Sequence, residues 1–124
     1  MNLKKINRAL ISISDKSDLT IILKILKKFK VEILSSGGTY KKINRLGFKS
    51  IEISDFTNSP EILDGRVKTL HPKLYGGILF KRNNKKHQKQ IKKIDIKKID
   101  LVIVNFYPFE EAVKTRNDKK IIEN

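Results

Sequence analysis

Cysteine is absent from this 124-residue chain. Its absence excludes disulfide bonds and cysteine-ligated metal sites. It also fits a protein of the cytoplasm, where we expect the chain to act. Hydrophobic runs are also short. None approaches the roughly 18 residues that suggest a membrane-spanning helix, and the opening MNLKKINRAL lacks the apolar stretch of a signal peptide. We therefore expect a single globular domain with no membrane partner.

Arginine is scarce, although the chain is strongly basic. The formal net charge is +15, and lysine outnumbers arginine severalfold. Such a charge alone suggests a polyanionic partner, but proteins that read nucleic-acid sequence favour the forked guanidinium of arginine. Lysine, isoleucine and asparagine share codons rich in A and T, so genome composition is the simpler explanation. The densest basic tract, 81–100, predicts a lysine-rich amphipathic helix with a solvated face. We expect no nucleic-acid partner.

Apolar runs alternate with helical spacings along the chain. The apolar runs predict strands at 9–13, 31–35, 49–53 and 99–106. The spacings predict helices at 17–29, 39–46, 76–80, 84–94, 109–115 and 118–124. Residues 54–73 should be mostly loop, with one helical turn after Pro60. Almost wholly apolar strands between helices are typical of a parallel sheet covered on both faces, so the predicted fold is α/β, a three-layer Rossmann-like sandwich.

Polar residues follow these strands at the edge where such folds bind ligands, beyond the carboxyl ends of the strands. They are Ser12, Ser14 and Lys16 after the first strand, Ser36, Gly37, Gly38 and Thr39 after the second, Arg66, Lys68, Thr69 and His71 after the third, and Asn105 and Tyr107 after the last. Hydroxyls, backbone N–H groups and cations on one edge suit a phosphate.

Each piece also has a purely structural interpretation. The turn SSGGT (35–39) matches neither the P-loop nor the dinucleotide pattern and serves equally well as a tight turn with a helix cap. Ser14 or Asp15 can cap the following helix, and Asn105 and Tyr107 can pack at a strand end. His71 can be structural, because the only other histidine, His87, lies in the lysine tract. The argument for a ligand rests on all the pieces falling on one edge.

Four segments carry a family resemblance. They are SISDKSDL (12–19), SSGGTYKKI (35–43), ISDFTNSPEILDGRVKTLHPKLYGGIL (53–79) and VNFYPFEEAV (104–113). In this order they closely resemble the N-terminal domain of the bifunctional purine biosynthesis proteins, which join IMP cyclohydrolase to AICAR formyltransferase. The stretch DGRVKTLHPK (64–73) followed by GGIL is the most specific part. The resemblance implies a methylglyoxal-synthase-like fold, in agreement with the predicted sandwich.

The resemblance also implies an activity. Formylated aminoimidazole carboxamide ribonucleotide (FAICAR) closes its second ring to IMP with loss of water, and no metal or redox cofactor is implied. By resemblance the small-molecule substrate is held by Ser12, Ser14, Lys16, Ser36, Gly37, Gly38 and Thr39, chiefly at its phosphate. Arg66, Lys68 and Thr69 would close over base and ribose, and Asn105 would line the far wall with Tyr107. Lys68 is the candidate for charge stabilisation and Tyr107 for orientation or proton relay. A homodimer is expected on the same ground.

The chain departs from the family pattern at its end. After residues resembling Glu123 and Asn124 the family continues into Ile-Asp-Ile-Gly-Gly, and that Asp and a later Lys belong to the cyclohydrolase site. We therefore expect a domain that is incomplete at its C-terminus and lacks the formyltransferase domain, with an exposed apolar sheet edge, marginal stability and little activity alone. The alternatives are a purine-nucleotide-binding remnant and a regulatory module like that of carbamoyl-phosphate synthetase.

Overall fold

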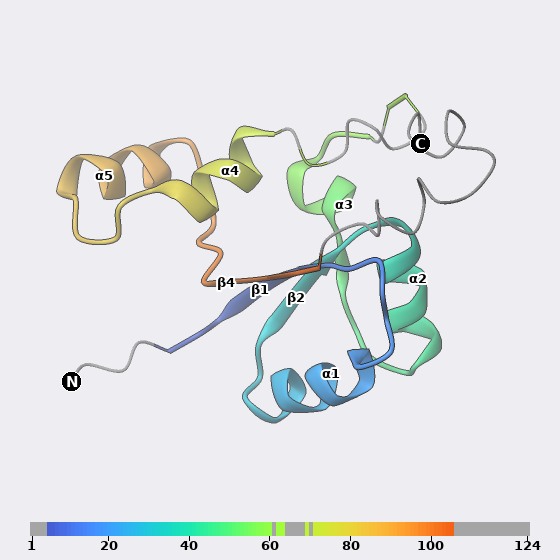
Figure 1. Ribbon diagram of the computed structural model, residues 1–124. Coiled ribbons are helices and arrows are strands. Elements are labelled where there is room, and N and C mark those ends of the chain that lie inside the picture. The colour runs from blue at the N-terminus through green and yellow to red at the C-terminus, as the bar shows by residue number, and fades with distance from the viewer. Residues whose placement is uncertain (1–4, 61, 64–68, 70, 106–124) are drawn as a thin grey trace, which may run out of the picture.

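Four parallel strands form the centre of the part of the chain that the structure describes. The computed structural model describes residues 5–60, 62–63, 69 and 71–105. The strands are β1 (Arg8–Ser12), β2 (Glu32–Ser35), β3 (Ile51–Glu52) and β4 (Leu101–Val104), and they lie in the order β3-β2-β1-β4 (Figure 1). β1 pairs with β2 on one side and with β4 on the other, so that Leu10 lies opposite both Leu34 and Val102. The predicted parallel α/β sheet is confirmed.

Helices cover both faces of this sheet. Successive strand residues point to opposite faces. Ala9 and Ile11 therefore pack on one face with Leu23 of α1 (Leu19–Lys28) and Ile43 of α2 (Gly37–Arg45). Leu10 packs on the other face with residues of α3 (Ile53–Thr57) and α4 (Pro72–Leu79). Together with α5 (Lys85–Lys93), α3 and α4 lie above the sheet in Figure 1, and α1 lies below it.

The strand order explains this division of the helices. The chain moves from β1 through α1 and α2 towards β3, and then returns past β1 to β4 through α3, α4 and α5. Crossovers between parallel strands are right-handed in nearly all proteins. A crossover that reverses direction along the sheet must therefore use the opposite face.

Several predicted boundaries were wrong. The strand expected at 49–53 is only Ile51–Glu52, and the expected loop after it begins with the helix α3. Burial of Ile53 and packing of Phe56 hold this short helix against the same face of the sheet as Leu10. Asn58, in the left-handed conformation, ends the helix. The second helix begins at Gly37 rather than at 39, and the predicted helix at 76–80 begins earlier, at Pro72. The elements predicted at 109–115 and 118–124 lie outside the described residues.

The lysine tract forms the predicted solvated helix. Ile91 is the buried residue of α5, while its lysines face solvent. On β4, Val102 and Val104 are exposed, as expected for an apolar strand at an edge of the described sheet. No helix within the described ranges is long and apolar enough to cross a membrane.

The glycines of GGIL (76–79) allow α4 to approach the segment before β4. A Cβ added at Gly77 would lie 2.5 Å from the carbonyl oxygen of Lys97, and one at Gly76 would lie 2.7 Å from Ile96 Cδ1. The Gly77 carbonyl also accepts a hydrogen bond from the backbone N–H of Ile99 at 3.0 Å. This motif of the resemblance therefore has a packing role.

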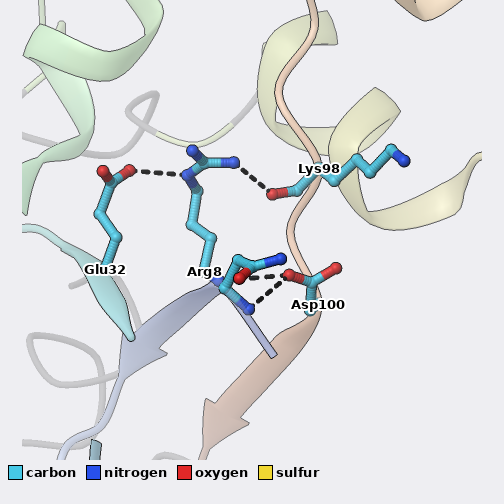
Figure 2. A network of polar contacts seen from close by, with 5 residues as sticks. Arg8, Glu32, Lys98 and Asp100 are labelled. Atoms are coloured by element: carbon cyan, nitrogen blue, oxygen red, sulfur yellow. Dashed lines mark hydrogen bonds and ion pairs between the residues drawn. The ribbon is translucent and has the colours of Figure 1, made fainter. Parts of the chain in front are cut away.

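A polar network ties the amino ends of three strands together (Figure 2). Arg8 Nε lies 2.7 Å from Glu32 Oε1, and Arg8 Nη1 donates to the carbonyl oxygen of Lys98 at 2.6 Å. Asp100 Oδ2 accepts hydrogen bonds from the backbone N–H groups of Asn7 at 2.9 Å and Arg8 at 3.2 Å. The starts of β1, β2 and β4 are thus fixed relative to one another.

The core makes a prediction about stability. Leu23→Ala should lower the free energy of unfolding by about 2–5 kcal/mol, because Leu23 is fully buried and a cavity would remain. Ile21→Ala, in the same helix, should cost less than about 1 kcal/mol, because Ile21 is 61% exposed. Urea unfolding followed by circular dichroism measures both values. Equal losses for the two variants would contradict the described packing of α1.

Candidate functional site

The loop between β1 and α1 is bound to the residue that follows β4. The backbone N–H of Ser14 donates a hydrogen bond to Asn105 Oδ1 at 2.6 Å, and the Ser14 hydroxyl donates to the same oxygen at 3.1 Å. Asn105 Nδ2 donates to the carbonyl oxygen of Asp15 at 2.8 Å. These bonds span about three-quarters of the chain in sequence and exist because β1 and β4 are neighbours, with Ser12 opposite Val104.

The same loop is held from the other side by Thr39, in the first turn of α2. Thr39 Oγ1 donates to the carbonyl oxygen of Ile13 at 3.1 Å and accepts from the Ile13 backbone N–H at 3.4 Å. Thr39 and Ile13 are both buried. Polar groups buried there would be costly if they were left unpaired, so this reciprocal pair stabilises the loop.

The N-terminus of α2 faces a lysine ammonium group. Ser36, the N-cap residue, makes no side-chain cap hydrogen bond, and the first turn contains no acidic residue. Lys16 Nζ donates to the Ser14 carbonyl at 3.2 Å, and a Cβ added at Gly38 would lie 3.8 Å from both Cε and Nζ of Lys16. A positive φ of 56° at Gly37 starts the helix at this point. The unsatisfied N–H groups, the helix dipole and the ammonium group together favour an anion.

Asp15 shapes the loop as a carboxylate. The Ser17 backbone N–H donates to Asp15 Oδ1 at 3.0 Å. This bond, helped by the Ser17 hydroxyl and the nearby Lys16 charge, lowers the pKa of Asp15 below its ordinary value. Asp15 is therefore ionised at neutral pH and is no proton donor there. The helix cap predicted at Ser14 or Asp15 was wrong, because the N-cap residue of α1 is Asp18.

Part of the predicted site lies together at the edge of the sheet formed by the carboxyl ends of its strands, which we call the rim. Ser14, Lys16, Gly38, Thr39 and Asn105 are linked by the contacts above. Ser12 is exposed at the end of β1, and Ser36 is buried before α2. No group of three or more His, Asp or Glu side chains that could hold a metal ion occurs among the described residues.

Only the last part of the loop at 64–73 is described. His71 is the N-cap residue of α4, and its Nδ1 accepts a hydrogen bond from the Lys73 backbone N–H at 3.1 Å, so this histidine has a structural role. The half-buried Thr69 accepts a backbone hydrogen bond from His71 at 2.9 Å. The predicted site residues Arg66, Lys68 and Tyr107 lie outside the described ranges.

Two buried threonines provide a matched test of the loop attachment. Thr39→Val should lower the free energy of unfolding by about 1–3 kcal/mol, because it leaves the buried Ile13 backbone groups unpaired. Thr57→Val should be neutral or stabilising, because the buried Thr57 hydroxyl has no hydrogen-bond partner within the described residues. Thermal and urea unfolding would measure both. A Thr57 variant that loses as much as the Thr39 variant would contradict the described attachment.

Comparison with known proteins agrees with the fold. The model of the MGS-like domain family matches residues 18–124. Proteins called bifunctional purine biosynthesis protein PurH are similar in sequence. The one from Acetivibrio thermocellus is 49% identical over 90% of this chain and 22% of its own length, and the one from Elusimicrobium minutum is 49% identical over 98% and 24%.

A solved structure has a similar fold. The structure titled "Crystal structure of ForH" superposes with a TM-score of 0.74 at 29% identity, over 82% of this chain and 53% of that one. The chain spans between a fifth and a quarter of the length of the PurH relatives, and its similarity is to their N-terminal region. With a family match over most of its length and a parallel sheet of the expected kind, the chain belongs to the MGS-like domain family.

Proposed function

We propose that the rim at the carboxyl ends of β1 and β2 binds the phosphate of a purine ribonucleotide. The observation that carries this proposal is the Lys16 ammonium group beside the uncapped N-terminus of α2. A phosphate there would receive backbone hydrogen bonds from the first turn of α2 and charge compensation from Lys16. Ser12, at the end of β1, and Ser14, in the loop that follows, are exposed residues.

We further propose that the chain supplies the cyclohydrolase unit of purine biosynthesis. Its similarity to the N-terminal region of PurH supports a role in that pathway. In the proposed reaction the carboxamide nitrogen of FAICAR attacks the formyl carbon, the ring closes, and the formyl oxygen leaves as water. The step needs an oriented formyl group and a donor or cation beside its developing negative charge. By the family resemblance Lys68 fills the second role, Tyr107 orients or relays a proton, and Arg66 and Thr69 hold base and ribose.

A binding-only role is the second candidate. It is favoured by the described contacts of Lys16 with Ser14 and with the start of α2, which suit an anion. In this role the chain would hold a purine nucleotide without converting FAICAR.

The phosphate site predicts an effect of Lys16 on nucleotide affinity. IMP should raise the melting temperature of the chain, and Lys16→Ala should weaken IMP binding by about tenfold or more, as expected for loss of a charge-assisted bond. Isothermal titration at fixed salt would measure the affinities. The control is Lys89→Ala in the lysine-rich α5, which removes the same charge and should leave the affinity unchanged.

The outcomes separate the two candidates. Equal weakening by both lysine variants would show that net charge alone attracts the nucleotide, and it would contradict a phosphate site at Lys16. If IMP binds as expected, an assay with FAICAR decides between the roles. Formation of IMP supports the cyclohydrolase, while binding without product supports the binding-only role.

A further inference from the structure

We propose that Asn105 is a positioning residue that sets the anion site by holding the loop at Ser14 and Asp15. The inference rests on the proposed nucleotide function. It differs from a direct contact between Asn105 and the ligand, which is what the family resemblance implies for this residue. Here Asn105 acts through the loop, and its effect is already present in the nucleotide-free protein.

Both ends of the Asn105 amide are engaged by the loop. Its oxygen accepts from the Ser14 backbone N–H at 2.6 Å and from the Ser14 hydroxyl at 3.1 Å. Its nitrogen donates to the Asp15 carbonyl at 2.8 Å. An amide is the side-chain group that offers an acceptor and a donor side by side, as this pairing requires.

The attachment continues from Ser14 to the cation of the site. Lys16 Nζ donates to the Ser14 carbonyl at 3.2 Å, and the same ammonium group lies beside Gly38 at the start of α2. If the backbone at Ser14 moves, the acceptor that helps to hold Lys16 beside α2 moves with it. Asn105 therefore influences a bound phosphate without touching it.

Thr39 fixes Ile13, the residue before Ser14, independently of Asn105. It binds both backbone polar groups of Ile13 from the β2 side of the loop. Loss of Asn105 should therefore leave Ile13 in place and release the loop from Ser14 onwards. This predicts a local effect that is distinguishable from general unfolding.

The test measures the nucleotide-free loop and the nucleotide affinity in the same variants. Amide hydrogen exchange measured by NMR reports on the Ser14 N–H, and titration with IMP reports on binding. In Asn105→Ala the Ser14 amide should exchange at least about tenfold faster, and the Kd for IMP should rise about tenfold, since hydrogen bonds to the loop are lost. The Ile13 amide should remain protected.

Two further variants serve as controls for the loss of an asparagine and for poor folding. Asn84, at the start of α5, also accepts a hydrogen bond from a backbone N–H, that of His87, and Asn84→Ala removes it. It should leave both Ser14 exchange and IMP affinity unchanged. Asn105→Asp keeps an acceptor for the Ser14 N–H and should retain most of the protection, which provides a test even if Asn105→Ala folds poorly.

The outcomes distinguish an action of Asn105 through the loop from a direct contact with the nucleotide. Unchanged Ser14 exchange in Asn105→Ala overturns the proposal, and if IMP binding weakens in that case, Asn105 acts by direct contact. Faster exchange with unchanged affinity overturns the link from the loop to the ligand. Failure of the unaltered chain to bind IMP contradicts the proposed function instead, and Ser14 exchange still reports separately whether Asn105 holds the loop.

Discussion

The pairing of β1 with strands on both sides is the constraint on which the rest of the structure depends. β2 and β4 flank β1 in parallel register, with Leu34 and Val102 opposite Leu10. Because the strands are parallel, the residues after β2 and β4 emerge on either side of the loop between β1 and α1. Thr39 and Asn105 can bind that loop only because the sheet has this order.

The two ends of the sheet differ in how their polar and charged groups are paired. At the amino end, Asp100 accepts two backbone N–H groups and the Arg8 guanidinium is shared between Glu32 and the Lys98 carbonyl. A cavity of about 450 Å³ near Arg8 and Lys97 lies at that end, but the Arg8 charge there is already paired. At the carboxyl end, the start of α2 has no side-chain cap and faces Lys16. The carboxyl rim therefore combines a cation with the backbone N–H groups of a helix N-terminus, which is an arrangement that favours a phosphate.

The sequence predicts the architecture well and the detailed contacts poorly. The sequence located all four strands. Burial on both faces explains the apolar runs of the central strands β1 and β2, whereas the edge strands β3 and β4 are partly exposed. The helix α3 was missed because five residues show no periodicity, although Asn58 is a residue type that often ends helices. Thr39 and Asn105 were assigned to the rim correctly by their positions after strands. Their hydrogen bonds to Ile13 and Ser14 could not be predicted from the sequence, because they join residues 26 and 91 positions apart.

Chemical-shift mapping of the backbone amides with IMP and with inosine tests the central claim most directly. The two probes share the base and the ribose and differ in the phosphate. A phosphate held at the start of α2 predicts that IMP shifts the amide signals of Gly37 and Gly38, and that inosine leaves them in place. Equal shifts with inosine, or IMP shifts confined to the amino end of the sheet at Lys97 and Lys98, would contradict a phosphate site at the carboxyl rim.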